Sequence, residues 1–506
     1  MTVFICQLSE LDWKVSREIG IYGNREGRVN DKGEQVFFKN MGSKGEQIIQ
    51  SIIEDLVGMQ KGDLVFFHVL DTSEEESSVH GIYRISEEPF YNESIKLWTS
   101  SSFLVYPYRF CFEPHPEHIE LCKYDSSILV SEFYKQIETR AIRSVLTLER
   151  EVQGAAHAVK TITSEDACEI EKLLYRDFSS RHAQTALNFK PAQMNKTPLI
   201  SHVERVGEIE FAIKAIVAYR LGRRDSDFTK FIPACGNGTY DFLIESFIGQ
   251  TLRRPTDIIC IGESRPERLV TIIEAKTKIA EIRDLIQSLN YREWFRLRNI
   301  DKGSLKYRIS LCLLAQKFKQ DLANYVKVRN TILPSEEIIL LKYVPTQNGK
   351  DSTFVIQALT DPAFLSTRKH LSVNSEALLS KIQSEPNSVY SILGKESPLK
   401  TIVEFESSEQ RKLTLRKYYF REGKKIYLGN LVILLINGKC TLEDFVKFMK
   451  FISEEALKFQ GDFMSVEPII VAESFEPMPD FFIEKYNEIE TLARKQPITA
   501  YIAFQS

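Results

Sequence analysis

Two carboxylates and a lysine stand at the ends of two short apolar segments of this chain. Asp257 opens the apolar residues 258–261, and Glu274 and Lys276 close the segment 269–273. Both segments are short and β-branched, which is typical of buried strands. Because strand side chains alternate between two faces, Glu274 and Lys276 share one face. Such groups are costly to bury without a function, and the pattern predicts a site that holds a divalent metal for phosphodiester hydrolysis.

Each of these residues has a role that its chemistry suggests. Asp257 and Glu274 could supply oxygen ligands to Mg²⁺, and the carbonyl of Ala275 could add a neutral one. The ammonium of Lys276 could orient the attacking water and offset the charge of the transition state.

A third carboxylate is expected from an amphipathic helix predicted over residues 202–221. Glu204 and Glu208 are expected to face water. Glu210 falls in one helical stripe with apolar residues and is therefore predicted to face inward; these neighbours are Val206, Ile213 and Val217.

Further along the chain, Gln287 and Tyr291 have the spacing i, i+4 on a helix predicted over residues 279–299. They should point the same way. An amide and a phenol in this position could contact a phosphate or the lysine.

Each feature also has a structural interpretation. Asp257 could cap a turn after Pro255, Glu274 and Lys276 could form the polar edge of a strand, and Gln287 and Tyr291 could be ordinary surface and core residues. Asp241 is a rival acidic ligand, although a turn is the simpler reading of its segment.

Taken in order, Glu210, Asp257, Glu274-Ala275-Lys276 and Gln287-x-x-x-Tyr291 resemble the PD-(D/E)xK nuclease superfamily in its RecB-like branch. The resemblance covers about residues 200–345. It implies a restriction-endonuclease-like mixed sheet flanked by helices, dependence on Mg²⁺ or Mn²⁺, and cleavage that leaves a 5′-phosphate. The sequence departs from the family pattern because Thr256 separates Pro255 from Asp257.

Basic residues near these motifs suggest a path for DNA. Arg253 and Arg254 immediately precede the first strand, and Arg292 and Arg296 follow Tyr291. Arginine side chains in such positions could bind phosphates. The alternative is a solvated helix face.

The first 115 residues are rich in aromatics and short strand signals, which predicts a small β barrel. Stacked aromatic rings bind flipped or unusual bases. Trp13 and Trp98 are the first choices for the walls of a base pocket, with Tyr22 and Ser16 nearby.

Several strings in this region occur in a suggestive order: Ile19-Gly20-Ile21-Tyr22-Gly23, Lys61-Gly62-Asp63, Gly81-Ile82-Tyr83 and Tyr106-Pro107-Tyr108-Arg109-Phe110. Together they resemble EVE domains, relatives of YTH domains among the PUA-like barrels, over about residues 1–160. The resemblance implies an aromatic pocket for a modified base in DNA or RNA.

The elements that must position these residues predict an α/β multidomain protein. We expect an EVE/PUA-like domain over residues 1–160, a nuclease domain over 161–365, and a C-terminal α/β domain of unknown role over 366–506. Strands and helices alternate in the central part, which indicates an α/β core. No internal repeat is evident in the sequence.

Composition narrows the function classes further. With 506 residues and a net charge of −3, any nucleic-acid surface must be a local patch. Eight cysteines occur without a CxxC pair, which argues against a structural zinc site and suits a reducing compartment. No apolar stretch is long enough to span a membrane, and no signal peptide is evident, so we expect a cytoplasmic location.

The combined interpretation is a Mg²⁺- or Mn²⁺-dependent DNA endonuclease directed to modified bases, which the resemblance to modification-dependent restriction endonucleases also implies. Cleavage of both strands would favour a homodimer. One alternative is a repair or defence nuclease for branched, mismatched or single-stranded DNA. Another is a non-catalytic RNA-binding protein that retains a nuclease fold.

Overall fold

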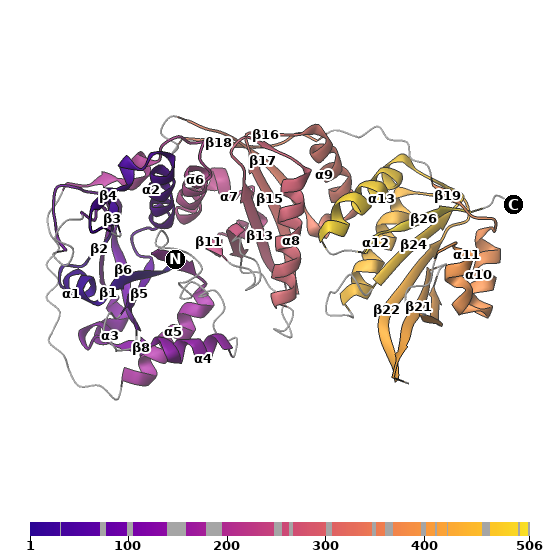
Figure 1. Ribbon diagram of the computed structural model, residues 1–506, viewed down its shortest axis with the longest axis horizontal. Coiled ribbons are helices and arrows are strands. Elements are labelled where there is room, and N and C mark those ends of the chain that lie inside the picture. Colours follow the sequence, from indigo (N-terminus) through magenta and orange to yellow (C-terminus); the bar gives the residue numbers. More distant parts are fainter. Residues whose placement is uncertain are drawn as a thin grey trace. The chain divides into compact units, whose positions relative to one another are not determined.

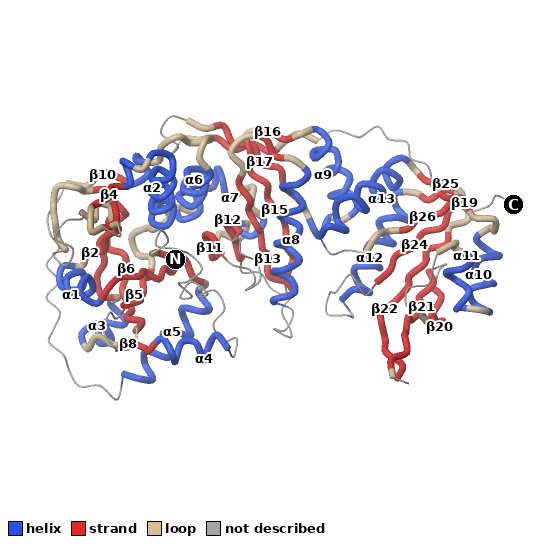
Figure 2. Tube along the Cα trace, viewed as in Figure 1, coloured by secondary structure: helices blue, strands red, loops and turns tan. Residues whose placement is uncertain are grey.

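The computed structural model describes the chain apart from residues 31, 71–76, 99–104, 139–157, 179–194, 247–255, 263–266, 300–305, 347–350, 360–367, 396–400, 410–411, 423, 458–465, 494–495 and 504–506. It has α/β architecture with several mixed sheets, as the sequence predicts (Figure 1, Figure 2). The described residues form two compact units. The N-terminal unit comprises residues 1–279, 314–317 and 341–356, and the C-terminal unit comprises the remainder.

The first part of the N-terminal unit is built on one sheet with the strand order β2-β7-β6-β5-β1-β9, and β8 and β10 both pair with β6. Strands β1 and β5 are parallel, and the other neighbours are antiparallel. The strands are β1 (Val3–Ser9), β2 (Ile21–Asn24), β5 (Leu64–Leu70), β6 (Ser78–Tyr91), β7 (Tyr108–Pro114), β8 (Ser127–Leu129), β9 (Val159–Ile162) and β10 (Thr197–Pro198).

Helices and a small hairpin accompany this sheet. The hairpin pairs β3 (Gly27–Val29) with β4 (Gln35–Phe37). The helices are α1 (Glu10–Ile19), α2 (Gly42–Val57), α3 (Ile119–Lys123), α4 (Val130–Glu138) and α5 (Ser164–Phe178). Strand β8 leads directly into helix α4, and residues 139–157 lie outside the described part of the chain.

The second part of the N-terminal unit carries the predicted acidic strands. It contains α6 (Glu210–Gly222), α7 (Ser226–Thr229), β11 (Tyr240–Ser246), β12 (Thr256–Gly262), β13 (Glu267–Ala275) and β18 (Thr353–Ile356). Strands β11, β12 and β13 form an antiparallel series. The helix expected from residue 202 begins instead at Glu210. Positive φ angles at Arg205 (52°) and Gly207 (90°) interrupt the backbone before it.

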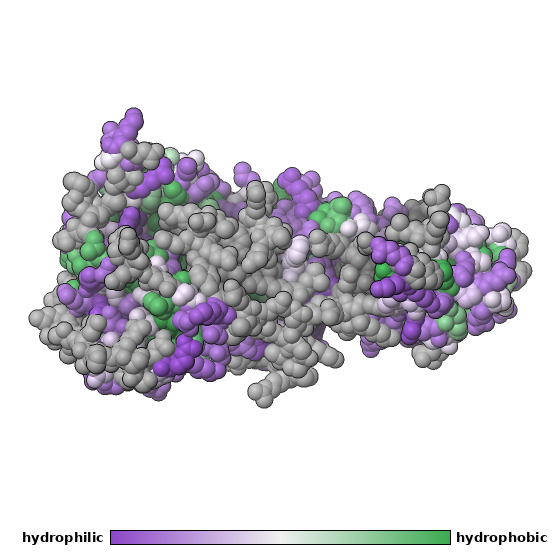
Figure 3. All heavy atoms as spheres, turned by 60° about the horizontal axis from the view of Figure 1, so that its bottom comes forward, coloured by the Kyte–Doolittle hydropathy of each residue, from purple (hydrophilic) through white to green (hydrophobic). Residues whose placement is uncertain are grey.

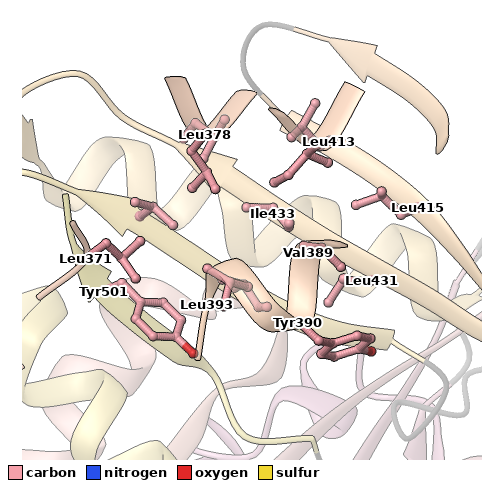
Figure 4. Packing of buried hydrophobic residues seen from close by; sticks show 14 of the residues in the cluster. Leu371, Leu378, Val389, Tyr390, Leu393, Leu413, Leu415, Leu431, Ile433 and Tyr501 are labelled. Carbon is pink, nitrogen blue, oxygen red and sulfur yellow. The ribbon is translucent and has the colours of Figure 1, made fainter. Parts of the chain in front are cut away.

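In the C-terminal unit, one sheet has the order β19-β26-β24-β22-β21-β20. Strands β22, β24 and β26 are parallel, and β20, β21 and β22 are antiparallel. Figure 4 shows aliphatic side chains of β21 and β22 packed with Leu378 and Leu393, which are buried. The elements are β19 (Lys369–His370), α10 (Ser375–Ser384), α11 (Val389–Ile392), β20 (Ile402–Glu409), β21 (Lys412–Arg421), β22 (Lys424–Leu435), α12 (Leu442–Leu457), β24 (Val466–Ala472), α13 (Pro477–Ile489) and β26 (Thr499–Ile502).

An internal repeat, which the sequence does not reveal, is visible in the order of elements. Strand β13 is followed by β14 (Ile279–Ala280), α8 (Ile282–Asn299), β15 (Lys306–Ala315), β16 (Lys317–Phe318), α9 (Gln320–Ile332) and β17 (Ile338–Val344). Strand β22 is followed in the same order by β23 (Lys439–Cys440), α12, β24, β25 (Ser474–Phe475), α13 and β26. Helices α9 and α13 both contain 13 residues.

Equivalent positions of the two segments make the same hydrogen bonds. The amide of Lys276 donates to Leu314 O (2.8 Å), and that of Ile436 donates to Val471 O (2.9 Å). The Asn330 side chain exchanges two hydrogen bonds with the backbone of Ile338, as Asn487 does with Ile498. The two segments therefore share their backbone architecture.

The surface of the described residues is mixed. On the face shown in Figure 3, hydrophobic residues occur in small groups among hydrophilic ones. None of the helices that the structure describes combines the length and the apolar character that a membrane crossing requires.

Candidate functional site

The two predicted carboxylates meet because β12 and β13 are antiparallel neighbours. The register pairs Ile258 with Ile273, which places Asp257 and Glu274 at the next position of the ladder. Asp257 is 7% exposed and Glu274 is 2% exposed. Asp257 Oδ2 accepts a hydrogen bond from the Ala275 amide at 2.7 Å, which anchors this one oxygen of the carboxylate.

Lys276 completes a cluster that we call the carboxylate site, formed by Asp257, Glu274 and Lys276. The Lys276 ammonium donates to Glu274 Oε1 at 2.6 Å and remains partly exposed. Tyr343 supports the turn that follows, because its hydroxyl donates to Thr277 O at 3.0 Å. The structure thus brings together three residues that the sequence predicted from two separate segments.

Burial and charge set the protonation of the site. Burial raises the pKa of Asp257 to about 6, with a contribution from Glu210 and opposition from Lys214 and Lys276. Burial, followed by the charge of Asp257, raises the pKa of Glu274 well above its usual range. Burial lowers the pKa of Lys276, but its carboxylate neighbours outweigh this effect and the net pKa is raised. Two buried carboxylates in this arrangement favour a nearby cation.

The donor atoms suit Mg²⁺ or Mn²⁺, which prefer carboxylate oxygens. Glu274 Oε2 is buried and has no hydrogen-bond partner among the described residues, so this oxygen could take a metal. Ala275, the expected carbonyl ligand, is the last residue of β13 and is buried. Asp241, the rival acidic ligand, instead accepts hydrogen bonds from the backbone and side chain of Ser164.

The predicted carboxylates do not form a tight preformed ligand set. In the described part of the chain, one group of at least three His, Cys, Asp or Glu side chains has ligand atoms that all lie within 4.8 Å of one another. This group is His115, Glu117 and His118, and it does not include the carboxylate site. Glu210 is the first residue of α6 and is exposed, so the expectation of an inward-facing side chain is wrong. Its charge nevertheless raises the pKa of both Asp257 and Glu274, which places it at the solvent side of the site.

Sequence reasoning missed two charged residues beside the carboxylate site. Lys214 of α6 is 2% exposed, and its ammonium lies 3.9 Å from Asp257 Oδ1. Glu54 of α2 is fully buried and lies 3.7 Å from the same ammonium. The signal for Lys214 was present, because it is the single charge within the apolar residues 211–218. No local signal connects Glu54 with residues so distant in the sequence.

Gln287 and Tyr291 lie on α8 of the C-terminal unit. The Gln287 amide donates to the Tyr291 hydroxyl at 2.8 Å, so the two side chains do point the same way. Their participation in the carboxylate site stays a prediction.

The structure places the arginines that were expected to bind DNA in different environments. Arg253 and Arg254 lie outside the described residues. Arg292 is 2% exposed and pairs with Glu336 at 2.8 Å, so the expectation of a DNA-facing side chain is wrong. Arg296 is half-buried and donates to Glu293 at 2.6 Å. Its contact with DNA stays a prediction.

A second site lies in the first part of the N-terminal unit. An aromatic cavity of about 390 Å³ is lined by the predicted residues Ser16, Tyr22 and Trp98, together with Tyr106 and others. The Trp98 indole donates to Ser16 Oγ at 2.9 Å, and its ring lies 5.0 Å from that of Tyr106. A Cβ at Gly23 would come within 2.6 Å of the indole, so only glycine leaves room for this ring.

Trp13 does not line the aromatic cavity. It is 3% exposed, and its ring lies 4.9 Å from Phe67 and 5.7 Å from Tyr83. The prediction that Trp13 forms a wall of the pocket is therefore wrong, because the side chain is part of the aromatic core. Aromatic content alone does not distinguish these two positions.

Comparisons with known proteins add little. No family model and no curated protein matches the chain. Similar solved structures include a hypothetical protein from Leishmania major (9% identity, 35% of this chain and 96% of that chain, TM-score 0.22). They also include the human THYN1 protein in complex with 5-methylcytosine-containing DNA (10%, 34% and 98%, 0.19) and a protein from Pseudomonas putida (13%, 34% and 99%, 0.20). These scores are too low to assign a fold or a function to this chain.

Proposed function

We propose that this chain is a metal-dependent DNA endonuclease that its aromatic cavity directs to modified bases. The observation that carries the proposal is the carboxylate site, where Asp257 and Glu274 are buried side by side with Lys276 against Glu274. Carboxylates with raised pKa values beside a lysine are typical of functional sites. The resemblance to PD-(D/E)xK nucleases agrees with this arrangement.

The residues have distinct roles in the proposed reaction. Bound Mg²⁺ or Mn²⁺ would polarise the scissile phosphate and lower the pKa of a bound water. Asp257 and Glu274 would hold the ion, and Glu210 could contribute from the solvent side. Lys276 would hold the attacking water and stabilise negative charge on the phosphate oxygens. As the water oxygen bonds to phosphorus it would lose a proton to solvent, and the bond from phosphorus to the 3′ oxygen would break as that oxygen takes a proton from solvent.

The aromatic cavity supports the second half of the proposal. Its volume lies within the usual range for small-ligand sites. Trp98 offers a ring face for stacking, and its bond to Ser16 holds the indole in place. The Tyr22 hydroxyl and the Asn24 side chain, 3.2 Å apart, could hydrogen-bond the edge of an extruded base. The resemblance of residues 1–160 to EVE domains agrees with a base-reading role for this cavity.

The test compares linear DNA prepared with dC, 5-methyl-dC, 5-hydroxymethyl-dC or N6-methyl-dA, each with Mg²⁺ or Mn²⁺. Lys276→Ala should reduce the cleavage rate by about 100-fold or more. Lys278→Ala is the matched control, because this neighbouring lysine is exposed. Cleavage restricted to one modified DNA supports the proposal.

Equal cleavage of every DNA would refute the base-reading role and favour the repair or defence nuclease. No cleavage of any DNA, with binding of RNA, would favour the non-catalytic alternative.

A further inference from the structure

Helix α2 reaches both candidate sites of the N-terminal unit. Ile48 and Ile52 line the aromatic cavity. Glu54, two residues after Ile52, makes an ion pair with Lys214 of α6. Residues of this one helix therefore contact the space proposed for the base and a neighbour of the carboxylate site.

The packing of α2 on α6 is unusually close at its end. A Cβ placed on Gly222 would lie 1.9 Å from Gly58 O, and one on Gly58 would lie 3.1 Å from Ala218 O. The two backbones are thus in direct contact, with no intervening side chains. Since packed elements of this kind have little room to adjust independently, a shift of α2 would be felt by α6.

A chain of buried charges continues from α2 into the carboxylate site. Glu54 Oε2 lies 3.7 Å from Lys214 Nζ, which lies 3.9 Å from Asp257 Oδ1. The side chains of Glu54 and Lys214 are 0% and 2% exposed. The Lys214 ammonium also lies 4.2 Å from the Phe211 ring centroid. A buried ammonium requires compensating charge, and here that charge comes from both neighbours.

We propose that Lys214 and Glu54 are positioning residues: Lys214 holds Asp257 in the orientation that binds metal, and Glu54 holds Lys214 from the helix that lines the aromatic cavity. This inference rests on the proposed function and adds a regulatory link to it. A base in the cavity would contact Ile48 and Ile52, and the position of α2 would then favour the metal-binding arrangement. Couplings of this kind typically change an affinity by about 5–150-fold.

The first experiment measures Mn²⁺ binding to the full chain by calorimetry, without DNA. Lys214→Met keeps the length of the side chain and removes its charge. It should weaken Mn²⁺ binding by about 10–100-fold, as is usual when a residue that supports a metal ligand is lost. Lys214→Arg should recover part of the affinity, which loss of packing alone would not predict.

The second experiment uses Glu54→Gln, which conserves side-chain volume. It should reduce the ratio of kcat/KM between modified and unmodified DNA, because the link to the cavity is weakened. Glu46→Gln is the matched control, since Glu46 lies on the same helix and pairs with Arg205 instead. A merely structural role would lower both rates together and leave the ratio unchanged.

The outcomes separate this inference from the proposed function. Unchanged or tighter Mn²⁺ binding in a folded Lys214→Met variant, or an unchanged ratio in Glu54→Gln, would overturn the inference while the nuclease proposal stands. Failure of the wild-type chain to bind Mn²⁺ or to cleave any DNA would overturn both. If Lys214→Met does not fold, Lys214→Arg and Glu54→Gln still decide the question.

Discussion

Neutralising Asp257 should change how the stability of the protein depends on pH. Burial raises the pKa of this carboxyl from 3.8 to about 6. Below pH 3.8 the carboxyl is protonated in both states, and as pH rises to 6 the unfolded chain releases the proton first. The contribution of this carboxyl to the free energy of unfolding is therefore fully present at low pH and is lost as pH rises through 6. At about 1.4 kcal/mol per pKa unit, the loss is about 3 kcal/mol.

Asp257→Asn removes this dependence, because the amide is neutral at every pH and can still accept the hydrogen bond from the Ala275 amide. The unfolding free energy of the variant minus that of wild type should therefore increase by about 3 kcal/mol from acidic to slightly alkaline pH. At about 2.1 cal/mol/K per residue, the midpoint of thermal unfolding of this unit of about 300 residues should shift by roughly 5 °C.

The assay follows thermal unfolding of both proteins in EDTA from about pH 4 to about pH 8, the range over which this carboxyl titrates. Asp227→Asn is the control, because the Asp227 side chain is 83% exposed. Its substitution should change the unfolding midpoint little, because an exposed side chain away from the core contributes little to stability. Mn²⁺ should shrink the difference for Asp257→Asn, since a bound cation stabilises the ionised carboxylate. A pH-independent difference for Asp257→Asn would refute the reasoning.

Three further predictions concern other parts of the molecule. Trp98→Ala should weaken binding of a modified base by about 1–3 kcal/mol of stacking energy, measured by fluorescence anisotropy, and Trp98→Phe should retain most of it. Arg292→Ala should lower the unfolding free energy by about 0.5–3 kcal/mol, because it removes a buried guanidinium that pairs with Glu336 and Glu490, although Arg329 still pairs with both carboxylates; an unaltered urea midpoint would contradict this. Gly222→Ala should separate α2 from α6 and lower the melting temperature, because its Cβ would lie 1.9 Å from Gly58 O; the same change at the exposed Gly238, whose φ is 74°, adds only the backbone strain of a left-handed alanine and should lower the melting temperature less.

Much of the carboxylate site could be predicted because strands carry a local signal. The apolar segments that contain Asp257 and Glu274 are β12 and β13, and their register follows from antiparallel pairing. The position of Lys276 beside Glu274 could be predicted because side chains two residues apart on a strand share one face. In the aromatic cavity, Ser16 and Trp98 were predicted correctly as neighbours.

The errors share a physical cause, which is that burial depends on distant partners. Arg292 looks like a surface arginine on a helix, yet Glu336 and Glu490 enclose it from other elements. Lys214 is buried because Glu54, which is remote in the sequence, compensates its charge. The start of α6 was misplaced because an arginine gives no sign of a positive φ, such as the one at Arg205.

The two segments of the internal repeat share their backbone architecture but differ at the positions of the carboxylate site. Counting from the shared hydrogen bonds, Lys276 corresponds to Ile436 and Glu274 to Leu434. In the antiparallel ladder, Leu434 pairs with Lys412, which occupies the position of Asp257. The second segment therefore has no carboxylates where the first has two. Backbone bonds and the Asn330 and Asn487 contacts hold both segments together, whereas side chains at the acidic positions are free to change.

The loss of carboxylates from the second segment predicts how many sites in each chain can cleave DNA. If the nuclease proposal is right, only one segment of each chain can hold the metal, because Leu434 and Ile436 offer no ligand. Lys276→Ala should then leave no second metal-dependent activity, and Mn²⁺ should not bind at Leu434 and Ile436 of the second segment. Residual metal-dependent cleavage that persists in Lys276→Ala but disappears when Lys412→Ala is added to that variant would show that the second segment is catalytic after all. Cleavage of both DNA strands would accordingly need two chains or two successive binding events.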